Sequence, residues 1–122
     1  MAREFYGATV EAQRSVSKLL SLGASGREQD WEFELADPNR IKEMLEALAS
    51  CTFSYDEKCA LALLLIASIE EAVESDKIEL GLVEDAKAVL KRDPNVHAAM
   101  IFYWIKQNRA SDAKMIKELL QM

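Results

Sequence analysis

Several residue types that build catalytic or cofactor sites are scarce in this sequence. Histidine occurs once, as His97, and no cysteine or acid near it completes a spaced set of metal ligands. The four glycines, Gly7, Gly23, Gly26 and Gly81, are scattered, so they form neither a phosphate-binding loop nor a dinucleotide fingerprint. A serine or cysteine nucleophile would need that single histidine as its base, and no local motif suggests such a pair. We therefore predict that the protein is not an enzyme and has no catalytic, cofactor-binding or metal-binding residues.

Cysteines and long apolar runs are also scarce. The two cysteines, Cys51 and Cys59, are interpreted as small buried hydrophobic residues rather than as a disulfide. The longest apolar run covers residues 60–69, interrupted only by Ser68, and is about half of the ~20 residues that a membrane span requires. Residues 1–7 contain an acid and a base and no apolar stretch typical of a signal peptide. These features predict a cytoplasmic protein with no membrane partner.

The chain is acidic, with a net charge of -6 over 122 residues. Such a chain repels a phosphate backbone, so we expect no direct contact with nucleic acid, whereas a basic protein is a natural partner. The same acidity also keeps many cytosolic proteins soluble, and that interpretation stays open. Hydrophobic residues make up 50% of the sequence, which is enough for one core at this length. We therefore expect one domain spanning residues 1–122.

Apolar residues recur at helical spacing through most of the chain, and three sequence signals mark where helices begin. Asp37-Pro38 and Asp93-Pro94 each place a capping acid before a proline, and Ser54 with Glu57 forms a capping box. The expected helices cover residues 9–22, 38–50, 54–75, 83–93, 95–108 and 111 onward. The predicted fold is all-α, a compact bundle or a stack of helical hairpins with about six helices.

Three segments carry more specific structural expectations. The helix that follows Ser54 is apolar around most of its circumference between residues 61 and 66, which predicts the centre of the core. Residues 31–35, Trp-Glu-Phe-Glu-Leu, alternate apolar with acidic residues, which is typical of an extended segment. Phe102, Tyr103 and Trp104 cover adjacent faces of one helix, and Tyr103 is expected to be the exposed member.

Acidic residues are concentrated in residues 70–85. This stretch contains one base, Lys77, and seven acids, which leaves -6: Glu70, Glu71, Glu74, Asp76, Glu79, Glu84 and Asp85. Glu70, Glu71 and Glu74 stand in the last turns of a predicted helix, where the helix dipole favours cations instead. Locally unfavourable residues often mark function, so these acids are candidates for partner binding. A solvated face screened by salt is the alternative.

A second group of acids surrounds two aromatic residues. Asp30, Glu32 and Glu34 alternate with Trp31 and Phe33 directly after a glycine-containing connection. Aromatic side chains bordered by charge suit the anchor of a protein interface. The same aromatic side chains could instead fix the connection to the core. The three acids are therefore included among the candidate partner-binding residues.

From Trp31 onward the sequence resembles immunity proteins of bacterial contact-dependent growth inhibition and related polymorphic toxin systems. The resemblance rests on the 31–35 segment, the Asp-Pro helix start, residues 54–58 (Ser-Tyr-Asp-Glu-Lys) before an apolar helix ending at residues 67–71 (Ala-Ser-Ile-Glu-Glu), and His97 with Tyr103-Trp104. It implies a protein that binds and neutralises the C-terminal domain of a cognate toxin, often a basic nuclease. An acidic surface suits that role because a nuclease presents cations to phosphate.

A different class of function remains open from the sequence. The chain could be a helical adaptor or a self-associating interaction module that uses apolar surface rather than its acids. Salt separates the two possibilities, because an acidic interface associates more slowly as the salt concentration rises, whereas an apolar interface hardly responds.

Overall fold

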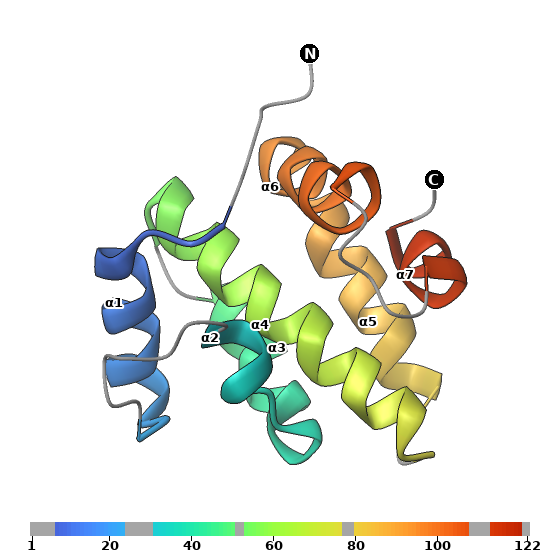
Figure 1. Cartoon of the computed structure of the whole chain (residues 1–122), viewed down its shortest axis with the longest axis horizontal. Helices are drawn as coiled ribbons and strands as arrows, with labels where there is room; N and C mark the ends of the chain where they lie inside the picture. The colour runs from blue at the N-terminus through green and yellow to red at the C-terminus, as the bar shows by residue number, and fades with distance from the viewer. Residues whose placement is uncertain (1–6, 24–30, 51–52, 77–79, 108–112, 121–122) are drawn as a thin grey trace.

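A buried central helix organises the computed structural model of this chain (Figure 1). The structure describes residues 7–23, 31–50, 53–76, 80–107 and 113–120. Its elements are α1 (Val10–Leu20), α2 (Trp31–Glu34), the 3₁₀ turn η1 (Pro38–Arg40), α3 (Ile41–Ser50), α4 (Tyr55–Glu74), α5 (Leu80–Lys91), α6 (Pro94–Met100), the π-helical turn η2 (Ile101–Lys106) and α7 (Ala113–Leu120). None of the described residues forms a strand, so the all-α prediction is confirmed.

Helix α4 crosses the middle of the molecule, with α1 on one side and α5, α6 and α7 on the other (Figure 1). Every residue from Cys59 to Glu70 is buried, because helices pack around the whole circumference of this segment. The predicted capping box starts the helix: the Glu57 amide donates to Ser54 Oγ at 3.2 Å, and the Ser54 amide donates to Glu57 Oε1 at 3.0 Å. These hydrogen bonds lower the pKa of Glu57. Both the start of α4 and its central position are therefore as the sequence predicts.

The segment at residues 31–34 is a short helix, so the prediction of an extended segment is wrong. Helix α2 packs on α4, and the Leu35 amide donates to the Trp31 carbonyl at 3.0 Å. The indole Nε1 of Trp31 donates to Ser17 Oγ of α1 at 2.9 Å, and the Asp37 amide donates to Ser68 Oγ of α4 at 3.0 Å. Partners from α1 and α4, distant in the sequence, thus hold α2 in place.

The prediction that Tyr103 is exposed is also wrong. Tyr103 is 3% exposed and Trp104 is 0% exposed, whereas Phe102 is half-buried. The hydroxyl of Tyr103 donates to the buried carboxylate of Glu32, so the phenol has a polar partner inside the core. The Trp104 ring packs edge-on against Tyr103 and Phe33, with ring centroids 5.1 and 5.5 Å apart.

Other predicted boundaries differ from the structure in detail. Helix α1 ends at Leu20, two residues before the expected end at residue 22, and Ser21 adopts a left-handed conformation (φ 52°). Asp37 and Asp93 cap the turns that start at Pro38 and Pro94, as predicted. Ser111, where the last helix is expected to begin, lies outside the described residues, as does Cys51, and Cys59 is buried. No helix of the described chain is both long and apolar enough to cross a membrane.

Candidate functional site

The structure separates the predicted acids into buried and exposed residues. Glu70 is 5% exposed and Glu32 is 7% exposed, so neither offers its carboxylate to a partner at the surface in this conformation. Glu34, Glu71, Glu74, Asp76, Glu84 and Asp85 are exposed. Asp30 and Glu79 lie outside the described residues. The two predicted groups of acids therefore do not form one surface that includes all of their members.

Four exposed acids lie where α4 ends and α5 begins. We name Glu71, Glu74, Asp76 and Glu84 the α4–α5 acids. The chain reverses between these two helices, which brings the end of one next to the start of the other (Figure 1). The carbonyl groups of the last turn of α4 add negative potential at this corner, and that turn contains no basic residue. The corner therefore gathers four exposed carboxylates, three of them next to the negative end of α4.

Few cations neutralise this corner in the part of the chain that the structure describes. Lys87 Nζ lies 3.3 Å from Glu84 Oε1, and the Glu84 carboxylate is 72% exposed. Glu71 and Asp76 have no ion-pair partner among the described residues. Asp76 adopts a left-handed backbone conformation (φ 56°) at the end of α4. These carboxylates are therefore available to a cationic partner.

Asp85 faces a different part of the surface. It lies on the wall of a groove between α3 and α5, which we name the α3–α5 groove. The groove contains two adjoining hollows of about 340 and 210 Å³ that share Ala49, Val89 and Arg92. The other residues that line them are Lys42, Leu45, Glu46, Leu48, Lys58, Leu82, Asp85, Ala88, Leu90, Asp93 and Val96. Because Leu48 and Ala49 line the smaller hollow together with Val89, Leu90, Arg92 and Asp93, the C-terminal ends of α3 and α5 lie side by side.

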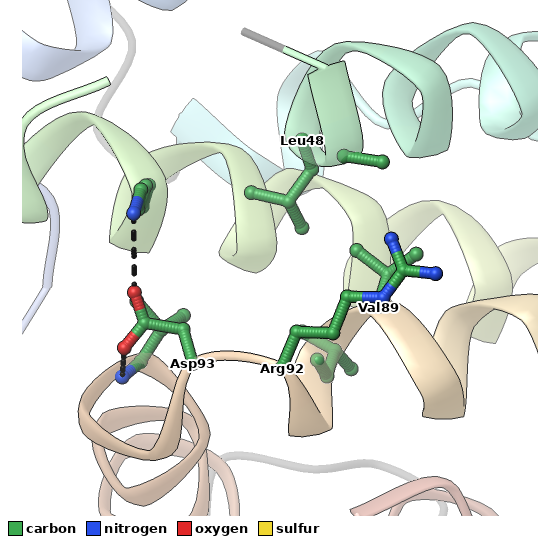
Figure 2. Close-up of a pocket in the computed structure, with 8 residues that line it drawn as sticks. Leu48, Val89, Arg92 and Asp93 are labelled. Carbon is green, nitrogen blue, oxygen red and sulfur yellow. Dashed lines mark hydrogen bonds and ion pairs between the residues drawn. The ribbon is translucent and has the colours of Figure 1, made fainter. Parts of the chain in front are cut away.

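The smaller hollow has a polar end (Figure 2). Lys58 Nζ lies 3.2 Å from Asp93 Oδ2, and both side chains are about one-third exposed (34% and 33%). Asp93 Oδ1 accepts from the amides of Asn95 at 3.2 Å and Val96 at 3.4 Å. Partial burial raises the pKa of Asp93, but the hydrogen bonds from Lys58, Val96 and Asn95 outweigh it, so the pKa is lowered. Asp93 is therefore held as a carboxylate.

Arg92 lies at the boundary between the two hollows. Figure 2 shows its side chain turned away from Asp93 and lying alongside Val89. Its guanidinium has no ion-pair partner among the described residues. The groove thus has an apolar floor, and two of its cations, Lys42 and Arg92, have no ion-pair partner among the described residues. The sequence analysis did not predict this groove. The spacing of Asp85, Ala88 and Arg92, which puts a small residue between opposite charges on one helical face, could have indicated it.

The single histidine has a structural contact. His97 is half-buried, and its Nε2 lies 2.8 Å from the carbonyl oxygen of Leu120 in α7. Because a carbonyl only accepts, Nε2 carries the proton. His97 therefore connects α6 to the end of α7. Among the described residues, no three His, Cys, Asp or Glu side chains gather as metal ligands would.

Comparisons with protein-family models, with curated proteins and with solved structures found no match for this chain.

Proposed function

We propose that this protein is a bacterial immunity protein that binds and neutralises a cognate toxin domain of the basic nuclease class. In this proposal the chain acts in the cytoplasm and has no catalytic role. The observation that carries the proposal is the group of exposed α4–α5 acids, of which Glu71 and Asp76 have no ion-pair partner among the described residues.

The electrostatics of this corner favour a basic partner. Glu71, Glu74 and Asp76 lie at the negative end of α4, where a carboxylate is less stable than at the start of a helix. A cationic protein surface would remove that unfavourable interaction on binding. A nuclease presents such a surface because it must bind phosphate, and an acidic binder can occupy the same place. Attraction between the two surfaces would also accelerate their association.

The proposal is tested first by co-expression. The C-terminal domain of the protein encoded immediately upstream is expressed with and without this chain, and growth is scored before co-purification. The proposal requires rescue of growth and a stable complex. Growth arrest that persists despite soluble expression of this chain, with no complex recovered, would contradict the immunity function.

A pair of charge variants then tests the surface. Glu71→Gln with Asp76→Asn removes two of the α4–α5 acids, and asparagine tolerates the left-handed backbone at position 76. Glu11→Gln with Glu118→Gln removes the same charge from exposed positions on α1 and α7. We expect the first pair to lower the association rate by about ten-fold at low salt and the control pair to change it much less. Equal effects of both pairs would show that net charge, rather than this corner, controls binding.

A further inference from the structure

The α3–α5 groove is electrically balanced in a chain that is strongly acidic overall. The larger hollow is lined by two cations, Lys42 and Arg92, and two acids, Glu46 and Asp85. In the smaller hollow, Lys58 is paired with Asp93. The whole chain carries -6, so two copies repel each other over most of their surfaces. This groove is a place where a second copy can approach without net repulsion.

The exposed face of α5 is complementary in charge to the same face of a second copy whose α5 runs in the opposite direction. Asp85, Ala88 and Arg92 are spaced i, i+3 and i+7, so they lie on one face of the helix, and all three are exposed. Asp85 and Arg92 are about 10 Å apart along the helix axis. Rotating a copy by half a turn about an axis through Ala88 places Arg92 of each copy opposite Asp85 of the other. The two ion pairs are equivalent, as a two-fold interface requires.

The remaining residues of the groove suit the same arrangement. Ala49 and Ala88 are both exposed, and their small side chains allow another helix to approach closely. Leu48, Leu82 and Val89 are half-buried and offer apolar surface beside them. The unpaired guanidinium of Arg92 would gain a carboxylate partner. A basic toxin domain has no such advantage here, because the cations and acids of the groove cancel.

We propose that the α3–α5 groove is the interface of a homodimer in which the two α5 helices run antiparallel. Asp85 and Arg92 form reciprocal ion pairs across the interface, and Ala88 lies next to the two-fold axis. This interface does not use Glu71 or Asp76, so it goes beyond the proposed toxin binding and does not depend on it.

Reversal of single charges tests the arrangement. The mass of the purified full-length chain is followed by sedimentation equilibrium over a range of concentrations. The wild-type chain is expected to form a dimer. Asp85→Arg and Arg92→Asp each place like charges opposite each other twice, so each is expected to weaken dimerisation by at least ten-fold (about 1.4 kcal/mol). Lys91→Asp changes an exposed cation of the same helix that does not line the groove, and this control should remain dimeric.

Mixing the two variants provides the decisive result. In a complex of one Asp85→Arg chain with one Arg92→Asp chain, both contacts are again Arg with Asp, so dimers should return as heterodimers, which native mass spectrometry identifies. Circular dichroism establishes that each variant is folded. Ala88→Glu, at an exposed position, is a second disruptive variant should either reversal fail to fold. A wild-type chain that stays monomeric, a dimer insensitive to these substitutions, or a mixture without heterodimers would overturn the proposal.

Discussion

Asp93 stabilises the fold through two interactions that substitution can separate. One carboxylate oxygen caps α6 by accepting from the amides of Asn95 and Val96, and the other receives Lys58 Nζ at 3.2 Å. Asp93→Ala removes both interactions. Asp93→Asn keeps a side-chain oxygen for the cap but loses the negative charge. Comparing the two variants therefore measures the cap and the ion pair independently.

The expected losses of unfolding free energy follow from the usual cost of removing a helix cap and from the exposure of the ion pair. Loss of an N-cap to alanine costs about 1 kcal/mol, with a range of roughly 0.5–2, whereas asparagine caps about as well as aspartate. The ion pair is about one-third exposed (34% for Lys58 and 33% for Asp93), so solvent screens it and it contributes about 0.2–1 kcal/mol. We therefore expect Asp93→Asn to lower the free energy of unfolding by up to about 1 kcal/mol, and Asp93→Ala by about 1–3 kcal/mol.

The pH dependence gives a second measurement of the same interaction. The pKa of Asp93 is lowered in the folded state from its ordinary value of 3.8, so near that pH the unfolded chain binds more protons. Its contribution to stability is complete above the unfolded-state pKa and is lost as the pH falls through the folded-state pKa. The stability difference between the wild type and Asp93→Asn should therefore be largest near neutral pH and should shrink in acid.

The assay is urea denaturation followed by circular dichroism, repeated with Lys58→Met and with the double variant Lys58→Met/Asp93→Asn. The double-mutant cycle should give a coupling of about 0.2–1 kcal/mol between Lys58 and Asp93. Asp37→Asn is the matched control, because Asp37 also caps a turn that begins with proline but has no ion pair among the described residues. If Asp93→Asn costs as much as Asp93→Ala, the separation into cap and ion pair is wrong.

Three further stability predictions use the same denaturation assay. Leu64→Ala should lower the free energy of unfolding by about 2–5 kcal/mol because Leu64 is 0% exposed. Leu19→Ala, at a side chain that is 49% exposed, should lower it by under about 0.5 kcal/mol. Similar losses from both substitutions would contradict the central position of α4. Tyr103→Phe should cost about 1–3 kcal/mol because the buried Glu32 carboxylate loses a donor, and a neutral result would show that this hydrogen bond adds nothing. Ser54→Ala should cost about 1 kcal/mol, and no loss would mean that the capping box is dispensable.

The sequence predicts helix starts well because the interactions that start a helix are local. Ser54 and Glu57 contact each other three residues apart, and Asp37 and Asp93 cap amides two or three residues ahead. Such partners fall within one turn of the chain, so residue identity alone indicates them. The fully apolar middle of α4 likewise predicts its central position, because a helix buried on all sides needs no polar face.

Predictions from local sequence patterns are wrong where contacts with distant residues determine the backbone conformation of a segment. The alternation in residues 31–35 suits a strand, but the strand would need a neighbour, and none exists among the described residues. As a helix, the segment places Trp31 and Leu35 one turn apart, with Trp31 buried and Leu35 half-buried. Trp31 contacts Ser17 and Glu32 contacts Tyr103, and no short stretch of sequence contains either pair.

The helix formed by α6 and η2 shows that side-chain hydrophobicity alone can assign the wrong residues to the buried face. Its buried residues are Val96, Ala99, Met100, Tyr103 and Trp104, which follow the i, i+3, i+4, i+7, i+8 pattern of an amphipathic helix. A face chosen by hydrophobicity alone would contain Ile101 and Ile105 in place of Ala99 and Tyr103, because isoleucine is the more hydrophobic residue. Both isoleucines are half-buried. The carboxylate of Glu32 makes burial of the Tyr103 hydroxyl favourable, and that partner is 71 residues away.

Counting charges along the sequence does not show which acids are exposed or which surface each one faces. This limit affects the proposed functions directly. Glu70 follows Ile66 by one turn of a helix buried on all sides, so its burial could have been inferred from the prediction that α4 is central. The count over residues 70–85 also joined acids that face different surfaces. Glu71 and Asp76 lie at the acidic corner, whereas Asp85 lines the same groove as the cationic side chains of Lys42 and Arg92. Because the two surfaces differ in charge balance, substitutions at positions 71 and 76 should change the proposed toxin binding without altering the proposed dimerisation. Reversal of Asp85 or Arg92 should change dimerisation first. A loss of both properties from one substitution, in a variant that remains folded, would mean that toxin binding and self-association use a single surface.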